Sequence, residues 1–403
     1  MTALPQGRRR DRYYGLGFVT DALLHLPFEG GVPYETDFSV DTNGHLGQKA
    51  TVTGGVIGRP GKFGKAVQVA EAVTNMVLNP VGGGASSIAA IGAATVTTQS
   101  TTKKYIWSTS TKLVTTAAAN DGIDYTLSAL TNAIHYVTIR IDVVWDTQEW
   151  SLDGTTYNAP TLLSSDDDGW YVYGFSFPAA QANGSTSLKI RQTDATIRTL
   201  YIGHVQAEAK AYPTPPCHGS LGTGHAWTGT AHNSTSTRTA ALLTYPTVGN
   251  INASQGSVTA WIKAYLNDDI GVILDADGTY DFFFFRTSTD IVRFRYGTSA
   301  GTTTLEGGTI ADNQWQHACC TWDENGAALY LDGVLVDSSA VAADIALNPI
   351  MQIGRERGSD RRYFNGYIDD FAILDRALTA DEVKAIYDSG NPLVVPGGYY
   401  YGA

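Results

Sequence analysis

The stretch GYIDDFAILDRALTADEVKAIY, residues 366–387, changes its hydrophobic period within a few residues and thereby decides the fold. Its first half alternates like a β-strand and carries an acidic pair, Asp369 and Asp370, near its start. Its second half begins with Thr379 and Glu382 at the spacing of a capping box and continues as an apolar helical stripe. A Gly-Asn-Pro sequence then ends the helix. These residues predict a strand followed by one short closing helix.

The composition is typical of an all-β protein, with 43 glycines and 22 tyrosines among 403 residues. The formal net charge of −12 excludes a general nucleic-acid binder, whose phosphate contacts need clustered Lys and Arg. No apolar run is long enough to span a membrane, and the N-terminal residues lack the apolar core of a signal peptide. Three cysteines without framework spacing exclude a disulfide-stapled scaffold. We therefore expect a protein made in the cytoplasm, with neither nucleic acid nor a membrane as its partner.

Three further segments carry turn and strand signals that belong with the strand and helix predicted for residues 366–387. Residues 58–69 read GRPGKFGKAVQV, a glycine-rich turn that would carry Phe63 into a core before a strand. Residues 256–266 place alternate apolar side chains on one face, and residues 313–337 hold two strands followed by an Asp-Gly hairpin. Together these segments resemble the laminin-G-like, concanavalin A-type sandwich domains. The resemblance implies a domain that binds sugars or proteins far more often than it catalyses.

The segments that carry this resemblance fall into two parts of the chain, separated by residues 79–235, which have a different sequence character. Residues 168–177 form an aromatic strand that opens with Gly-Trp-Tyr, and residues 201–216 form a closing strand in which Gln206 and Glu208 precede a Tyr-Pro-Thr exit. These motifs resemble the jelly-roll carbohydrate-binding modules common in bacteriophage virion proteins. The predicted fold class is therefore all-β, a concanavalin A-like (laminin-G-like) β-sandwich interrupted by an inserted β-jelly-roll domain, with one short C-terminal helix.

The domain boundaries follow from these changes of character. Insertions succeed at exposed loops whose ends lie close together. The predicted parts are an N-terminal arm at residues 1–19, the laminin-G-like sandwich at residues 20–75 plus 238–390, the inserted module at residues 79–235 and a C-terminal tail at residues 391–403.

Candidate catalytic residues are missing, and we expect no enzyme. Sandwich-fold glycosidases need two carboxylates facing each other, and the Glu-x-Asp-x-x-Glu strand familiar in this fold does not occur. Neither a Gly-x-Ser-x-Gly elbow nor a His-Glu-x-x-His motif is present. His218, His225 and His232 recur at even spacing near Cys217, but this spacing fits no familiar zinc pattern. We interpret them as loop histidines.

Flat aromatic side chains are the candidate sugar platforms of the inserted block, because sugar rings stack on them. The candidates are Trp107, Trp145, Trp150, Trp170 and Tyr171. A Trp on a strand lies in a core more often than on a platform. Trp145 and Trp150 flank a hairpin-like segment, so these two are the better candidates for an exposed edge.

Two loops of the outer sandwich, residues 275–280 and 354–363, are candidates for a binding rim. Arg355 and Arg361, with two further arginines, crowd the second loop. Such a cluster would dock on an acidic glycan or on a neighbouring subunit. The alternative is a solvated charged loop.

No cofactor is required by the sequence, and a structural calcium is the one candidate. The resemblance implies a calcium held between the ends of the sandwich by Asp369 or Asp370. Asp37 or Asp41 in a polar loop would complete its oxygen ligands. The alternative is that the acidic pair is structural.

The nested order of the two resembled families occurs mainly in phage structural proteins. It implies a non-enzymatic bacteriophage virion structural protein, a capsid decoration or tail-associated protein, assembled in the host cytoplasm. Its expected partners are other virion proteins, its own copies and a host-surface glycan. The expected attachment residues lie in the two tails: Arg8, Arg9, Arg10, Tyr399, Tyr400 and Tyr401. The alternatives are a bacterial surface or polysaccharide-binding module, which should carry a signal peptide or catalytic domain, and a glycosidase or lyase, which needs paired acids.

Overall fold

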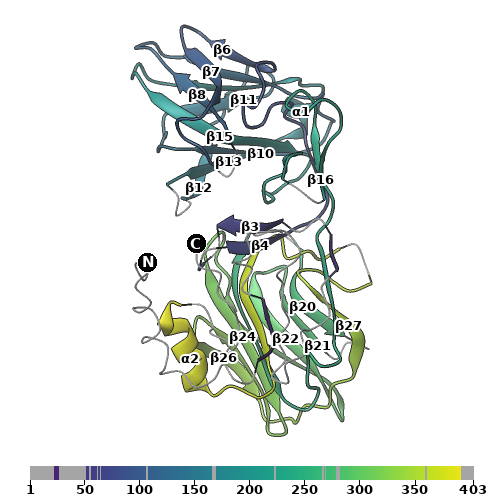
Figure 1. Cartoon of the computed structure of the whole chain (residues 1–403). Coiled ribbons are helices and arrows are strands. Elements are labelled where there is room, and N and C mark those ends of the chain that lie inside the picture. The colour runs from purple at the N-terminus through teal and green to yellow at the C-terminus, as the bar shows by residue number, and fades with distance from the viewer. Residues whose placement is uncertain are drawn as a thin grey trace, which may run out of the picture.

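The computed structural model describes residues 22–26, 51–53, 56–60, 62–63, 65–105, 108–165, 169–221, 224–265, 267, 269–277, 282–358 and 361–391. Within these ranges the chain forms 28 strands and two short helices. They are arranged as two bodies, one above the other (Figure 1). None of the described helices is long and apolar enough to cross a membrane. The all-β prediction is confirmed.

The lower body of Figure 1, here called the outer sandwich, consists of two antiparallel sheets. The eight-stranded sheet has the order β26 (Val334–Ser339), β25 (Gly326–Leu331), β24 (Gln316–Asp323), β19 (Gly256–Ala264), β28 (Gly366–Leu374), β4 (Lys65–Val69) and β3 (Val56–Pro60), and β1 (Ala22–Leu26) also pairs with β28. The seven-stranded sheet has the order β2 (Thr51–Thr53), β18 (Leu242–Pro246), β27 (Leu347–Ile353), β20 (Gly271–Asp277), β21 (Phe282–Arg286), β22 (Ile291–Thr298) and β23 (Gly301–Thr309). The first described strand therefore lies beside one of the last.

The core of the outer sandwich lies between the facing sheets. On β19, Val258, Ala260 and Ile262 point into this core, and Trp261 points away from it, as the alternation in the sequence predicts. Phe284 and Phe294 enter the same core from the seven-stranded sheet. The period-2 pattern thus assigns the two faces of β19 correctly, because one face of its sheet is buried against the other sheet.

The closing helix α2 (Ala380–Ser389) has both predicted ends. The Thr379 hydroxyl accepts a hydrogen bond from the backbone N–H of Glu382, and the Glu382 carboxylate accepts one from the backbone N–H of Thr379. Gly390 ends the helix in the left-handed region, at a φ of 55°. Val383 and Ile386 pack beside Leu378 on the outside of the eight-stranded sheet. The helix therefore covers the face that the other sheet leaves open (Figure 1).

An uncharged histidine is buried near this helix. His317 on β24 is fully buried, and its Nε2 lies 2.6 Å from the hydroxyl oxygen of Thr259. Its ring lies beside Trp261, which stacks on Tyr387 of α2 at 5.8 Å between ring centroids. Burial lowers the pKa of His317 from 6.5 to about 3, because the charged imidazolium would lose its hydration there.

We expect His317 to make the protein less stable as the pH falls. Between pH 6.5 and about 3 only the unfolded chain protonates this side chain. The free energy of unfolding should therefore fall by up to about 1.4 kcal/mol for each pH unit in this window, and the loss should disappear above it. Urea unfolding of the wild-type protein and of His317→Gln at several pH values measures the two slopes. Equal slopes for the two proteins would contradict the assignment.

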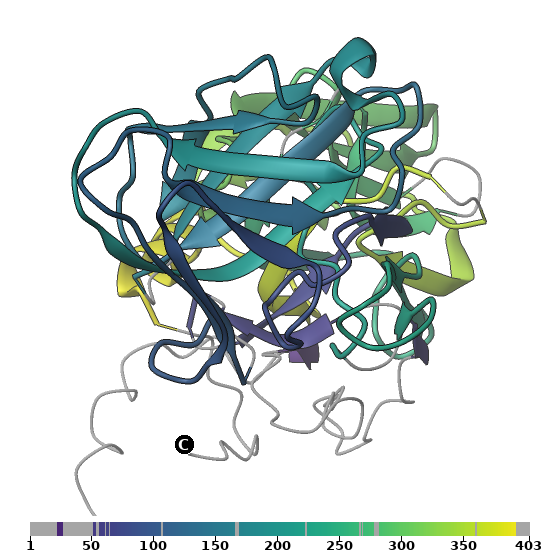
Figure 2. The same cartoon turned by 90° about the horizontal axis from the view of Figure 1, so that it is seen from above.

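The upper body, here called the nested sandwich, also has two sheets, seen from above in Figure 2. The six-stranded sheet has the order β12 (Thr161–Ser165), β13 (Tyr171–Phe177), β10 (His135–Ile141), β15 (Thr199–Glu208), β8 (Ser110–Val114) and β7 (Thr95–Ser100). The four-stranded sheet has the order β11 (Gln148–Ser151), β14 (Ser187–Gln192), β9 (Gly122–Thr126) and β6 (Ile88–Ile91), and the short helix α1 (Ala179–Ala182) precedes β14. A second hydrophobic core, separate from that of the outer sandwich, lies within these strands.

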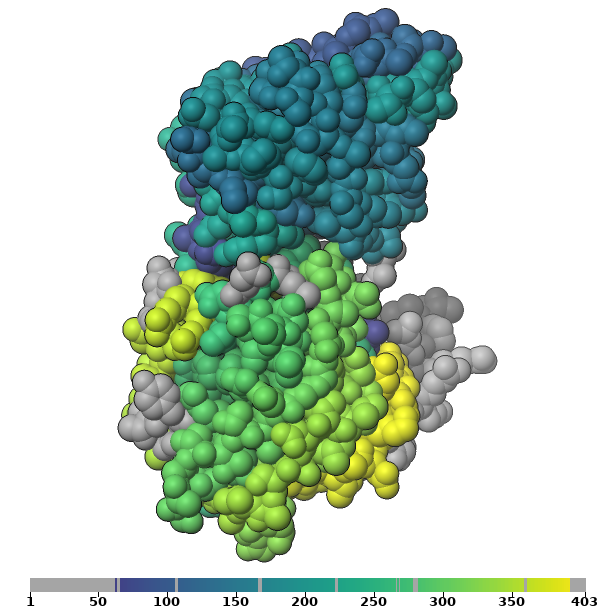
Figure 3. Space-filling model, turned by 180° about the vertical axis from the view of Figure 1, so that it is seen from behind, coloured from purple at the N-terminus to yellow at the C-terminus, as the bar shows by residue number. Residues whose placement is uncertain are grey.

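A three-stranded sheet joins the two bodies at the narrow waist seen in Figure 3. Its strands are β5 (Val73–Asn75), β17 (Ser236–Arg238) and β16 (His225–Trp227). β5 leads into the nested sandwich and β17 leads out of it, and the two pair antiparallel, with Asn75 opposite Ser236 and Val73 opposite Arg238. Backbone hydrogen bonds therefore tie the two connections to each other.

Buried polar side chains reinforce this waist. The Arg238 guanidinium, 2% exposed, donates to the carbonyl oxygens of Glu71 and Pro215 and to the hydroxyl of Thr214. The carboxylate of Glu208 accepts from the backbone N–H of Thr214 at 2.9 Å, and burial raises its pKa. The segment that follows β15 is thus fastened to the strands that connect the two sandwiches.

Candidate functional site

The seven-stranded sheet of the outer sandwich carries two rows of aromatic and charged side chains on the face turned away from the core. Cross-strand register partners form each row, so their side chains lie next to one another on that face. The rows are Asp275–Phe283–Arg295 on β20, β21 and β22, and Phe285–Arg293–Glu306 on β21, β22 and β23. Phe284 and Phe294 alternate with these residues along β21 and β22 and belong to the core. The rows therefore lie on the opposite face of the sheet.

The arginines of these rows cover the phenylalanines. The guanidinium carbon of Arg293 lies 5.6 Å from the ring centroid of Phe285, and that of Arg295 lies 5.4 Å from the ring centroid of Phe283. Both rings are only 3% exposed. Cation–π contact and packing therefore restrict both arginine side chains while leaving their charged ends near the surface.

A loop rich in arginine folds against the same face. The backbone N–H of Arg357 donates to the carboxylate of Asp275 at 2.7 Å, and its guanidinium donates to the backbone carbonyl of Asp277 at 2.6 Å. The Asp277 carboxylate in turn lies 3.5 Å from the guanidinium of Arg295. The described parts of the two loops predicted to form a rim therefore meet at Arg357, which contacts both Asp275 and Asp277.

Other arginines of this loop are held by their own neighbours. Glu356 pairs with both Arg361 and Arg362, at 2.7 and 2.5 Å. Arg355 donates to the phenol oxygen of Tyr363 at 3.2 Å. The side chain of Arg361 is 62% exposed and that of Arg362 is 31% exposed. Arg355 and Arg357 are half-buried, so Arg361 is the most exposed arginine of the loop.

We call this surface the arginine face. Its described residues are Arg293, Arg295, Arg355, Arg357, Arg361 and Arg362, with the carboxylates of Asp275, Asp277, Glu306 and Glu356. Among the described residues six guanidinium groups are thus gathered with four carboxylates, on a chain with a formal net charge of −12. Burial raises the pKa of Asp275, and the hydrogen bond from the backbone of Arg357 opposes that shift. Arginines therefore outnumber carboxylates among these described residues, and each of the four carboxylates already lies against an arginine or backbone N–H groups.

Arg355 and Arg361 were candidates from the sequence, whereas Arg293 and Arg295, which share this surface, were not named there. Their signal was present, since the run IVRFRYGT at residues 291–298 places two arginines two positions apart on a strand. Alternation fixes that both arginines share a face. It does not reveal that the 354–363 loop folds onto that face, because this depends on the contact between Asp275 and Arg357.

The prediction that Trp145 and Trp150 form an exposed edge is wrong. Their exposed fractions are 1% and 0%, and both belong to the core of the nested sandwich. Trp150 shares a face of β11 with Gln148, to which its indole N–H donates at 2.8 Å, and that face points inward. Trp170 is also buried, at 4%. None of these three rings can stack on a sugar in this conformation.

The remaining aromatic candidates have different positions. Tyr171 is half-buried and packs against the core of the nested sandwich. Trp107 and the attachment candidates Arg8, Arg9, Arg10, Tyr399, Tyr400 and Tyr401 lie outside the described residues. The attachment role of the tails stays a prediction.

Asp369, the first residue of the acidic pair of β28, accepts hydrogen bonds from backbone groups. The two carboxylate oxygens of Asp369 accept from the backbone N–H groups of Phe63 and Asp370, at 3.0 and 2.8 Å. In the part of the chain that the structure describes, no group of three or more His, Cys, Asp or Glu side chains is placed to hold a metal ion. Asp37 and Asp41 lie outside it. Asp369 thus anchors the Phe63 turn, and the described residues alone do not fit a calcium site.

Two of the evenly spaced histidines meet near the waist. The rings of His218 and His232 lie 5.5 Å apart, and Trp227 contacts both. The His232 ring rests on Gly83 of the nested sandwich so closely that a Cβ there would lie 2.3 Å from it. Cys217 is buried, which raises the pKa of its thiol to about 11. His218 and His232 thus pack the loop against the nested sandwich, as expected of loop histidines, whereas His225 lies on strand β16.

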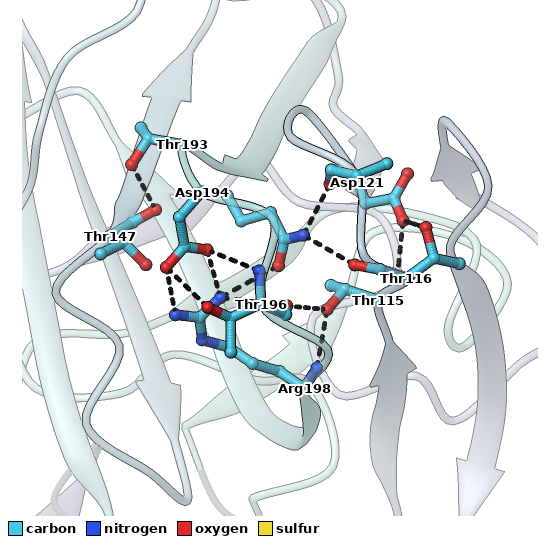
Figure 4. A network of polar contacts seen from close by, with 10 residues as sticks. Thr115, Thr116, Asp121, Thr147, Thr193, Asp194, Thr196 and Arg198 are labelled. Carbon is cyan, nitrogen blue, oxygen red and sulfur yellow. Dashed lines mark hydrogen bonds and ion pairs between the residues drawn. The ribbon is translucent and has the colours of Figure 1, made fainter.

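A second polar network ties together loops at one end of the nested sandwich (Figure 4). Arg198 pairs with both carboxylate oxygens of Asp194, at 2.5 and 2.7 Å, which holds the pKa of Asp194 below its usual value. The backbone N–H of Arg198 donates to Thr115, and Asp121 accepts from both donors of Thr116. Partners within the loops themselves satisfy these carboxylates, so the network fixes loop positions.

A comparison with protein families finds a match, and it lies mainly in the outer sandwich. Residues 235–384 match the model of the concanavalin A-like lectin/glucanases superfamily. The matched residues hold β17 of the waist, the described strands of the outer sandwich from β18 onwards and the first half of α2. The predicted lectin-type sandwich with a short C-terminal helix is therefore confirmed. A comparison with curated proteins finds no match.

Solved structures show partial likeness. The receptor binding domain of botulinum neurotoxin mosaic serotype C/D is 15% identical with a TM-score of 0.31, over 37% of this chain and 40% of that chain. The Ruminococcus gnavus IT-sialidase CBM40 bound to alpha2,3 sialyllactose is 17% identical with a TM-score of 0.30, over 34% of this chain and 83% of that chain. This chain thus spans about two fifths of the length of the toxin domain that it resembles. Likeness at this level says nothing about the ligand of this chain.

Proposed function

We propose that this protein is a non-enzymatic structural protein of a bacteriophage virion, a capsid decoration or tail-associated protein, that binds a surface glycan through its lectin-type sandwich. The observation that carries the glycan-binding part is the arginine face. It combines restrained cationic side chains with polar neighbours on an open strand surface, and such preorganised polar groups give a binding site its specificity.

The virion part of the proposal rests on the nested organisation. We propose that residues 79–235 are a carbohydrate-binding-module-like jelly roll inserted between residues 20–75 and 238–390. Two separate cores and the pairing of β5 with β17 support this division. Strands β8, β10, β13 and β15 lie in one sheet and β9, β11 and β14 in the other, an alternation that supports a jelly roll. The tails would join the protein to other virion proteins and to its own copies during assembly in the host cytoplasm.

The non-enzymatic part of the proposal is supported by the hydrogen bonds and ion pairs of the carboxylates on the arginine face. Glycosidases need one carboxyl group as acid and a second as nucleophile or base, facing each other across the bond to be cleaved. Asp275 instead holds backbone N–H groups, while Asp277, Glu306 and Glu356 each lie against an arginine. Carboxylates used in this way position the arginines.

An array of bacterial surface polysaccharides, probed with the purified full-length chain, tests this function. We expect retention on at least one polysaccharide without release of reducing ends, and we expect the protein in purified phage particles. Release of reducing ends would show an enzyme. Glycan binding by a protein that is missing from particles would favour the alternative, a bacterial surface or polysaccharide-binding module.

A further inference from the structure

We infer that the arginine face selects anionic polysaccharides, those carrying sulfate or carboxylate groups, over neutral ones; this inference rests on the proposed glycan-binding function. The first reason is the charge of the face. Its described residues include six arginines, and the four carboxylates among them already lie against an arginine or backbone N–H groups. A neutral sugar gains only hydrogen bonds from such a surface, whereas sulfate or carboxylate groups gain charge-assisted ones.

The second reason is the spacing of the cations. Arg293 and Arg295 occupy alternate positions of β22 and project from the same face. Alternate residues of a strand lie about 7 Å apart, so the two guanidinium groups can meet different anionic groups of one chain. Arg361 and Arg362, both held by Glu356, add a second cationic point on the loop. A repeating polyanion can engage several of these points, which multiplies weak single contacts.

The third reason is preorganisation. The rings of Phe283 and Phe285 hold the stems of Arg295 and Arg293, and Asp275 fixes the backbone of the loop at Arg357. Less side-chain entropy is then lost when a ligand binds. The planar guanidinium also matches sulfate and carboxylate oxygens in pairs, which a lysine ammonium cannot do.

The negative net charge of the whole chain affects how retention on a polyanion is interpreted. With a formal net charge of −12, the protein as a whole repels a polyanion, so uniform ion exchange over its surface does not favour retention. Binding must then come from a local cationic surface and should weaken as salt screens it. A change of charge at an isolated surface cation should have little effect, and deletion of residues 1–14 should leave retention unchanged if Arg8, Arg9 and Arg10 do not contribute.

The experiment compares heparin, polygalacturonate and dextran, which are sulfated, carboxylated and neutral, as immobilised ligands for the full-length protein. We expect retention on heparin or polygalacturonate at least about tenfold stronger than on dextran at about 0.1 M salt, the size of one or two charge-assisted contacts. The comparison of heparin with polygalacturonate shows which anionic group is preferred. Arg361→Glu should reduce that retention about tenfold, and Arg293→Gln should reduce it less.

Lys384→Glu is the matched control, because it makes the same charge change at an exposed cation of α2, whose side chain is 62% exposed. We expect it to stay within about twofold of the wild type, since exposed charges elsewhere are screened. Equal retention on dextran would overturn the anionic preference but leave glycan binding standing. Equal losses for Arg361→Glu and Lys384→Glu would overturn the location. Retention on none of these ligands, together with an empty polysaccharide array, would overturn the proposed function as well.

Discussion

Replacing Trp150 by Ala should lower the free energy of unfolding by about 3–5 kcal/mol, because a fully buried indole is removed and a cavity remains. The ring lies in the core of the nested sandwich, and its N–H donates to Gln148, which would lose that partner. Urea unfolding followed by tryptophan fluorescence and by circular dichroism measures the change.

Val144→Ala is the control for Trp150. Val144 lies in the same sandwich but is 49% exposed, so its truncation should cost less than about 0.5 kcal/mol. If Trp150→Ala were as stable as Val144→Ala, Trp150 would have to be a surface platform after all, and its placement in the core would be wrong.

Replacing Arg238 by Ala should cost about 2–4 kcal/mol, nearly as much, although no hydrophobic core is touched. The change leaves the carbonyl oxygens of Glu71 and Pro215 without this donor and removes a cation that stabilises the charge of buried Glu208. Because these contacts join the two sandwiches, we also expect their unfolding transitions to separate. Differential scanning calorimetry measures both effects.

Arg238→Lys separates charge from geometry at the same position. A lysine keeps the positive charge beside Glu208 but cannot reproduce the several donors of the planar guanidinium. Its stability should therefore fall between those of the wild type and Arg238→Ala. A single unshifted transition for Arg238→Ala would show that the waist does not depend on this side chain.

The elements that the sequence predicted correctly carry local signals. The capping box of Thr379 and Glu382, the Asp332-Gly333 hairpin and the alternation of β19 each depend on residues within a few positions of one another. Such signals act at short range, so tertiary context seldom overrides them. The early strands of the nested sandwich lacked them, because residues 81–130 are rich in Ala and Thr and only weakly patterned.

The candidate site was harder to predict, because it depends on contacts between distant segments. Trp150 sits next to a turn, but only the packing of β11 against β14 and the six-stranded sheet decides which face of the strand is inward. Arg357 and Asp275 stand 82 positions apart, and no sequence pattern links them. The arginines could be counted from the sequence, whereas their convergence on one face could not.

Hydrogen exchange of the full-length protein, with and without the polysaccharide that it retains best, tests the central claim most directly. A ligand on the arginine face should slow exchange in β22, β23 and the segment 354–358, because binding suppresses local opening of the backbone that it covers. The nested sandwich should exchange as before. Protection confined to the nested sandwich, with β22 and the loop unchanged, would contradict the assignment of glycan binding to the arginine face.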